Sequence, residues 1–208
     1  VSALKKLSAL KGVGSLVFVI GLSGLAQLMV HTTWVIYTGI KFGWGPKENG
    51  LSLFAVGAMA VLVQGFLLPR LLKRFSPQRL VVWGLASSVI TNFVWGAATE
   101  GWMMYAIIAF NILGFAASTA MQSLVSNAAD AKTQGQTMGA VSSLNSVMAV
   151  LAPVLGMGLM YLVAELPRGD WRIGAPFYFC ALLQTASLFF AWRHFGRQAN
   201  PVPLARAS

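Results

Sequence analysis

The sequence has few acidic side chains and few charged side chains of any kind. Its 208 residues include 15 Lys and Arg, five Asp and Glu and two His, so that only 10% are charged. A soluble domain usually carries about 25% charged residues. Because the chain is also 57% hydrophobic, it could not hide its apolar surface from water. The scarcity of charge therefore excludes an ordinary soluble domain and predicts a membrane protein.

Cysteines and recognisable ligand motifs are scarce as well. The single cysteine, Cys180, lies in an apolar run and cannot form a disulfide within the chain. No pattern of metal ligands or cofactor-binding residues is evident, so neither a metal nor a cofactor is expected. The net charge of +10 forms no continuous patch, so no nucleic-acid partner is expected. The chain begins with Val1 rather than Met, which favours a fragment of a longer protein.

The apolar residues are gathered into six long runs. A helix needs about 20 apolar residues to cross the hydrocarbon core, and only helices satisfy their own backbone polar groups there at this length. The sequence therefore predicts an all-α membrane protein with a six-helix bundle at residues 15–192, a flank at residues 1–14 and a tail at residues 193–208. The predicted spans are Ser15–Thr38, Leu51–Leu72, Leu80–Ala98, Trp102–Ser126, Gln134–Val163 and Gly174–Trp192.

Along the chain, the gaps between the runs alternate in charge. One set holds eleven cations and one acid: Lys5, Lys6, Lys11, Arg70, Lys73, Arg74, Arg79, Asp130, Lys132, Arg193, Arg197 and Arg206. The other set holds four cations and four acids: Lys41, Lys47, Glu48, Glu100, Glu165, Arg168, Asp170 and Arg172. Cytoplasmic loops carry an excess of Lys and Arg. This asymmetry predicts a multi-pass protein of the inner, cytoplasmic membrane with both chain ends in the cytoplasm.

The polar side chains at membrane depth are uncharged. Gln27 and His31 share a helical face that Trp34 continues, and Asn111 and Phe115 share another. Such groups either line a pocket for a bulky, partly polar molecule or join helices by hydrogen bonds. Hydrogen bonding between helices is favoured for Asn92 and Gln184, and for His31 over a role as proton carrier. The predicted substrate-binding residues are Gln27, His31, Trp34, Gln64, Asn111, Phe115 and Asn145.

Two local patterns bear on mechanism. Pro153 interrupts the fifth run and predicts a kink there, with Gly156 one turn further on. The string Gly-Leu-Ser-Gly at 21–24 matches that of intramembrane serine proteases. Its candidate base, His194, lies past the end of the last run, while Ser23 lies roughly 12 Å deep by helix rise. A nucleophile and its base must lie within hydrogen-bond reach, so an enzyme is not expected.

Five stretches resemble, in order and spacing, the C-terminal half of a major facilitator superfamily transporter. They are WVIY (34–37) with FGW (42–44), NGLSL (49–53), PRLLKRFSPQR (69–79), AMQSLVS (120–126) with QGQ (134–136) and Gly139, and APVLG (152–156). The third resembles the cytoplasmic loop motif Gly-x-Leu-x-Asp-Arg-x-Gly-Arg-Arg, although Lys73 replaces its aspartate. The resemblance covers roughly residues 12–197, and it is most marked to the drug:proton antiporters of the tetracycline-efflux type.

The resemblance implies one half of a transporter built from two inverted three-helix repeats, with the lipid bilayer and an N-terminal six-helix half as partners. It implies export of a small-molecule substrate by alternating access, driven by protons whose binding acid lies in the other half. Under this reading Arg70, Lys73, Arg74 and Arg79 belong to a gating loop; otherwise they are positive-inside anchors. The alternatives are a metabolite or sugar uptake permease of the same fold, and a half-protein that assembles with a partner without transporting.

Overall fold

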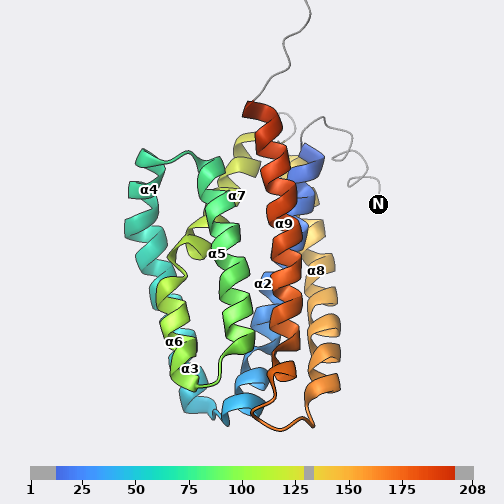
Figure 1. The fold of residues 1–208 in the computed structure, drawn as a ribbon. Helices are drawn as coiled ribbons and strands as arrows, with labels where there is room; N and C mark the ends of the chain where they lie inside the picture. Colours follow the sequence, from blue (N-terminus) through green and yellow to red (C-terminus); the bar gives the residue numbers. More distant parts are fainter. Residues whose placement is uncertain (1–12, 129–133, 200–208) are drawn as a thin grey trace, which may run out of the picture.

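The apolar runs form helical rods in the computed structural model, which describes residues 13–128 and 134–199 (Figure 1). Five rods in this part of the chain are long and apolar enough to cross a membrane, and the bent pair α6–α7 forms a sixth. The prediction of an all-α membrane protein with six spans is therefore confirmed. The helices are α2 (Val13–Phe42), α3 (Pro46–Leu62), α4 (Leu68–Arg74), α5 (Pro77–Ala97), α6 (Gly101–Phe110), α7 (Ile112–Ala128), α8 (Gln134–Val163) and α9 (Ala175–Ala199).

The second span is one rod with a π-helical turn, Val63–Leu67, between α3 and α4. Pro69 explains the position of this turn, because proline has no backbone N–H and its ring crowds the carbonyl four residues earlier. A wider turn gives that carbonyl room without ending the helix. The predicted span at 51–72 therefore lies where it was expected, but it is not a regular α-helix throughout.

The fourth span is broken, where the sequence predicts one continuous helix. α6 and α7 meet at Asn111 with a bend of 51°. Asn111 departs from helical geometry, with φ −80° and ψ 37°. Its side chain lies against Gly114, where any larger residue would collide with the amide. An asparagine whose side chain competes for local hydrogen bonds can interrupt a helix in this way.

The first span is longer than predicted, because α2 continues past Thr38 to Phe42. Lys41 was expected in a loop and is instead 7% exposed. Its ammonium donates a 2.7 Å hydrogen bond to the carbonyl of Gly96 in α5. The C-terminal turn of a helix also favours a cation. These two interactions offset the burial of the charge and carry the helix four residues further.

The predicted gaps fall at two ends of the bundle (Figure 1). The start of α2, the junction of α4 and α5 and the end of α9 lie at one end, drawn at the top. The α2–α3, α5–α6 and α8–α9 junctions lie at the other end. Arg70, Lys73, Arg74, Arg79 and Arg193 thus share the upper end, as their charge pattern predicts. Lys5, Lys6, Lys11, Asp130, Lys132 and Arg206 lie outside the described residues.

The packing of the helices matches two repeats of three spans. α2 packs along α9 and α8, while α5 packs along α7 and α9. The α2–α9 pair joins the first and last spans, and the α5–α7 pair joins the third and fourth. Exchanging the first three spans with the last three converts one pair into the other. This is the packing expected of two inverted three-helix repeats.

Small residues set the spacing between these helices. The Cβ of any larger residue at Gly84 in α5 would overlap Ala117 in α7. At Gly156 in α8 it would lie 2.6 Å from Cγ2 of Thr33 in α2. Gly156 thus has a packing role. α8 runs through Pro153 as a single helix, and a kink at that residue stays a prediction.

Two apolar clusters fill the bundle, one toward each end. Along α5, Leu80, Val81 and Leu85 belong to the first cluster and Trp95 to the second. Along α9, Ala191 belongs to the first, and Phe177 and Cys180 to the second. Polar residues of both helices lie between the clusters, including Asn92 and Gln184. The bundle therefore has a polar layer near its middle, where a binding site can form.

Candidate functional site

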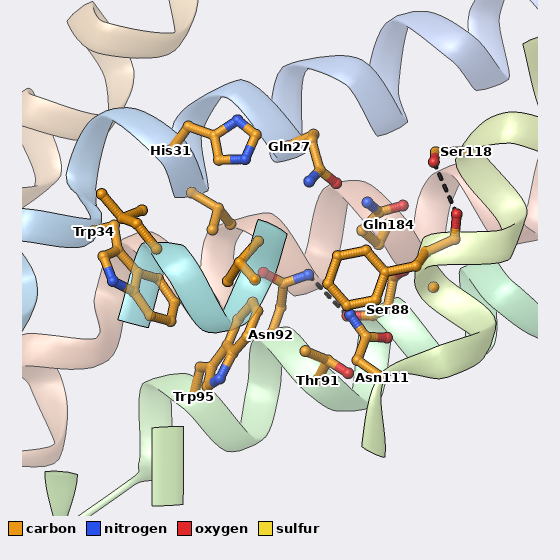
Figure 2. Close-up of a pocket in the computed structure, with 15 residues that line it drawn as sticks. Gln27, His31, Trp34, Ser88, Thr91, Asn92, Trp95, Asn111, Ser118 and Gln184 are labelled. Carbon is orange, nitrogen blue, oxygen red and sulfur yellow. Dashed lines mark hydrogen bonds between the residues drawn. The ribbon is translucent and has the colours of Figure 1, made fainter. Parts of the chain in front are cut away.

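A cavity of about 90 Å³ lies in this polar layer. Helices α2, α3, α5, α7 and α9 contribute to its wall, together with Asn111 at the α6–α7 break. Figure 2 shows Gln27 and His31 of α2 along one side, with Asn92 and Trp95 of α5 facing them. The cavity is lined by Gln27, Val30, His31, Trp34, Leu53, Val56, Ser88, Thr91, Asn92, Trp95, Asn111, Gly114, Phe115, Ser118 and Gln184.

Five of the seven predicted substrate-binding residues are brought together here: Gln27, His31, Trp34, Asn111 and Phe115. Asn145 of α8 lines a neighbouring cavity of about 400 Å³, which shares Gln27 and Ser118 with the first. Gln64 is exposed in the π-helical turn and lines neither cavity. The binding role of all seven residues stays a prediction.

Trp34 forms a fixed wall of the cavity. Its side chain is 3% exposed. The indole Nε1–H donates a 3.0 Å hydrogen bond to Oγ of Ser52 in α3. The ring packs edge-on against Trp95, with centroids 5.0 Å apart. Aromatic pairs favour this arrangement, so Trp34 supplies a rigid apolar surface while its polar atom is already paired.

Asn111 both lines the cavity and joins two helices. Oγ of Ser87 in α5 donates a 3.1 Å hydrogen bond to Oδ1 of Asn111. The sequence left a pocket role and a joining role open for this residue. The amide that holds the helix break against α5 also forms part of the cavity wall, so Asn111 joins helices, and its substrate-binding role stays a prediction.

Three further polar residues of the cavity carry buried atoms without a hydrogen-bond partner in the described part of the chain. These atoms are Oδ1 of Asn92, Nε1 of Trp95 and Oε1 of Gln184. Asn92 and Gln184 were expected to join helices, but these two oxygens join nothing there, and Nδ2 of Asn92 donates to Ser88 of its own helix. Trp95 was not singled out, because nothing in the sequence distinguishes a tryptophan beside a cavity from one that packs between helices.

An exposed strip of uncharged polar side chains runs beside the cavity, and we call it the polar face. Its members come from three helices, α2, α7 and α8. They lie well inside the spans rather than at the helix ends, which distinguishes the polar face from an ordinary loop surface. The polar face consists of Gln27, His31, Ser118, Gln122 and Asn145, all of which are exposed.

The predicted gating cations lie around the α4–α5 junction, at the upper end of the bundle in Figure 1, and none of them lines this cavity. Arg70, Lys73, Arg74 and Arg79 are all exposed. The guanidinium of Arg70 donates to the carbonyl of Phe66 in the preceding turn. Within the described residues the one ion pair found joins Arg172 to Asp170, at the opposite end. The gating role of the four cations at the α4–α5 junction stays a prediction.

The register of α2 and α9 keeps Ser23 of the protease-like string away from its candidate base, His194. Oγ of Ser187 donates to the carbonyl of Val19, and Sγ of Cys180 to that of Ala26. These two contacts set an antiparallel register in which Ser23 lies level with residue 183. His194 is about 11 residues further, or roughly 16 Å along the helix axis. That distance is far beyond hydrogen-bond reach.

Among the described residues, up to six apolar spans surround an internal polar cavity, as is typical of a multi-pass membrane transporter. The sequence profile of the Major Facilitator Superfamily matches residues 16–207. The chain therefore belongs to that family, whose members are transporters.

Named relatives agree with the predicted resemblance to tetracycline-efflux proteins. The chain is 30% identical to the class D tetracycline resistance protein of Salmonella ordonez, over 83% of this chain and 44% of the relative. It is 30% identical to the class G protein of Vibrio anguillarum, over 84% and 44%. It is 23% identical to the mouse hippocampus abundant transcript 1 protein, over 74% and 32%. The chain thus spans less than half the length of these relatives.

Proposed function

We propose that this chain is the C-terminal half of a proton-coupled exporter of small drug-like molecules. The observation that carries the proposal is the polar face. Burying unpaired amides in lipid costs free energy, so such groups in a membrane face other protein or water. A second six-helix half placed against the polar face would cover it and would leave a water-filled cavity between the halves. Movement of one half against the other then exposes that cavity to each side in turn.

The direction of transport is proposed from the relatives, whose names describe resistance to tetracycline. A membrane transporter that confers resistance to a drug does so by lowering the internal concentration of that drug. Export needs an energy source, and a proton gradient is proposed. Among the described residues the acids are Glu48, Glu100, Glu165 and Asp170, and all four lie at helix ends or in loops. The proton-binding acid is therefore assigned to the other half.

The orientation is proposed from the charges. The upper end of the bundle in Figure 1 holds the gap with Arg70, Lys73, Arg74 and Arg79. Excess Lys and Arg favour the cytoplasmic side. We therefore place this end in the cytoplasm and the protein in the inner membrane. A reporter fused after α9 in the full-length protein tests the placement, since a reporter that works only in the periplasm would reverse it.

Transport in membrane vesicles tests the function. The full-length protein that contains this chain is expressed, and everted vesicles that are more acidic inside than outside are given labelled tetracycline, so that protons leaving the lumen can drive the drug in. Accumulation that disappears when the gradient is collapsed is expected. A pair of variants follows: Gln27→Leu on the polar face should reduce accumulation, whereas Trp102→Phe, at an exposed position outside both cavities, should not.

Two other outcomes would replace this proposal. Tetracycline or sugar uptake only into intact, right-side-out cells would indicate an uptake permease. Absence of transport of any tested solute, from a protein that assembles correctly, would indicate a half-protein with a structural role.

A further inference from the structure

An open groove of about 550 Å³ runs between α5 and α6 on the outside of the bundle. Eight of its ten lining residues are apolar, from Trp83 on α5 to Leu113 just beyond the α6–α7 break. Ile90 and Phe110, which lie on its two walls, are 64% and 85% exposed. Because α5 and the α6–α7 pair are membrane spans, the groove opens into the hydrocarbon of the bilayer rather than into water.

The break at Asn111 opens this groove. α7 packs along α5, whereas α6 is bent away from the direction of α7 by 51° and packs on α3 as well (Figure 1). Ala86 of α5 and Ala106 of α6 line the space between the helices with small side chains. A broken helix and two small residues therefore build the groove into the fold.

The groove lies away from the polar face. α5 contributes no residue to the polar face, although it forms one wall of the groove. On α7, Leu113 lies five residues before Ser118, which places the two about 140° apart around the helix axis. A second six-helix half placed on the polar face would thus leave the groove uncovered. The surrounding lipid is what meets this surface.

Along α5 the groove has the length of one leaflet. Trp83, Ser87, Ile90 and Val94 follow one another at intervals of four, three and four residues, so they share one face of the helix. From Trp83 to Val94 the helix rises roughly 16 Å, and half of the hydrocarbon core is roughly 15 Å thick. Tryptophan favours the boundary between hydrocarbon and headgroups. One acyl chain therefore fits along the groove with its headgroup beyond Trp83.

Arg79 lies at the depth where that headgroup would be. It is exposed and lies one turn before Trp83 on the same face of α5. Phe75, which follows α4, packs edge-on against Trp83 with centroids 5.0 Å apart. The four acids among the described residues lie at the other end of the bundle. A guanidinium binds phosphate through paired hydrogen bonds, whereas the ammonium of a zwitterionic headgroup would meet no counter-charge from the described residues.

We propose that the groove between α5 and α6 binds one anionic phospholipid, with an acyl chain along α5 and the phosphate at Arg79. The chain gains no hydrophobic free energy on leaving the bilayer, because lipid tails are as apolar as the groove. It gains van der Waals contacts, since an unfilled groove leaves its lining atoms without partners. Arg79 adds a preference for a headgroup of net negative charge. The lipid site depends neither on the transported solute nor on the direction of transport.

Native mass spectrometry of the delipidated full-length protein tests the site, with phosphatidylglycerol as the probe and phosphatidylcholine as the neutral comparison. Arg79→Gln should weaken binding of the tightest phosphatidylglycerol about fivefold, the effect of one cation near an anionic lipid surface. It should leave phosphatidylcholine binding unchanged. Arg193→Gln removes an exposed cation at the same end but outside the groove, and it should bind both lipids as the wild type does. Equal weakening by the two variants would indicate a diffuse attraction to the cationic end and would overturn the site.

Two groove variants test the position of the acyl chain. Ala106→Phe fills the groove and should weaken phosphatidylglycerol binding about threefold through lost contacts, whereas Ala109→Phe, exposed on α6 outside the groove, should not. Phe110→Ala removes part of a wall and should act in the same direction. Because that side chain is 85% exposed, its loss should not impair folding. Phe54→Ala, 74% exposed on α3, is its control. If neither groove variant differed from its control, the headgroup alone would hold the lipid and the groove site would be wrong.

Two further measurements separate other occupants. Glycerol phosphate, which has no acyl chains, should not displace phosphatidylglycerol; displacement would indicate a site for free phosphate and would overturn the lipid site. The lipid-bound species should have the mass of one full-length chain and one lipid. A dimer that dissociates in Ala106→Phe would show that a second copy fills the groove, which would also overturn it. Neither measurement uses a transported solute, so failure of tetracycline export and failure of the lipid site are distinguishable.

Discussion

The hydroxyl of Tyr37 in α2 donates a hydrogen bond to the backbone carbonyl of Trp95 in α5. One turn further along α2, the ammonium of Lys41 donates to the carbonyl of Gly96, at 2.7 Å. The last carbonyls of a helix have no partner in the following turn. Two side chains of α2 thus satisfy the end of α5, and they fix the residue whose indole lines the central cavity.

Tyr37→Phe should lower the free energy of unfolding by about 1 kcal/mol, the usual net contribution of a hydrogen bond. The hydroxyl is fully buried, so water cannot replace it. Chemical unfolding in detergent micelles measures the change. Tyr105→Phe is the matched control, because that hydroxyl donates to the carbonyl of Glu48 at an exposed position. A loss as large in the control would contradict the special role of Tyr37.

Gly84→Ala should destabilise the bundle by about 1–3 kcal/mol, the cost of overpacking. A Cβ at this position would overlap the side chain of Ala117 and the carbonyl of Leu113, so α5 and α7 must move apart. The same substitution at Gly57 in α3 meets nothing within 4 Å. Because alanine is the better helix former, Gly57→Ala should leave the melting temperature equal or raise it. Equal effects at both sites would refute close packing at Gly84.

The spans could be predicted from the sequence because length and hydropathy decide whether a helix crosses a bilayer. The ends of the helices depend on single tertiary contacts that hydropathy does not record. α2 reaches Phe42 because a carbonyl of α5 accepts from Lys41. Similarly, the break at Asn111 depends on Gly114 and on Ser87 of another helix. A lone asparagine in an apolar run indicates neither contact.

The candidate site was predicted in part for a related reason. Helical periodicity places Gln27, His31 and Trp34 on one face, so their convergence could be expected. Whether a buried amide joins two helices or lies beside a cavity depends on its distance from polar groups of the neighbouring helix. The sequence does not record that distance. The sequence therefore favours helix joining for Asn92 and Gln184, whereas both residues line the cavity and their buried amide oxygens have no hydrogen-bond partner among the described residues.

Thiol labelling should distinguish the polar face from the lipid-facing surface. Gln27→Cys and Asn145→Cys should react with a polar, membrane-impermeant maleimide in the full-length protein, because water fills the proposed cavity. Phe93→Cys, which replaces a side chain that is 57% exposed on α5, should not react, since lipid covers it. The native Cys180 is 1% exposed and should stay unlabelled in all variants. Labelling of Phe93→Cys at the rate of Gln27→Cys would contradict this assignment of faces.

Arg74→Ala should slow transport while leaving stability unchanged. The side chain is exposed and forms no ion pair with the described residues, so its removal should change the free energy of unfolding by less than about 0.5 kcal/mol. If Arg74 pairs with an acid of the other half in one conformation, its loss changes the balance between conformations. The rate of tetracycline export should then fall, with equilibrium affinity little changed. Arg193→Ala, another exposed cation at the same end of the bundle, controls for the loss of one positive charge. Equal export by both variants and the wild type would leave Arg74 as a topological anchor without a gating role.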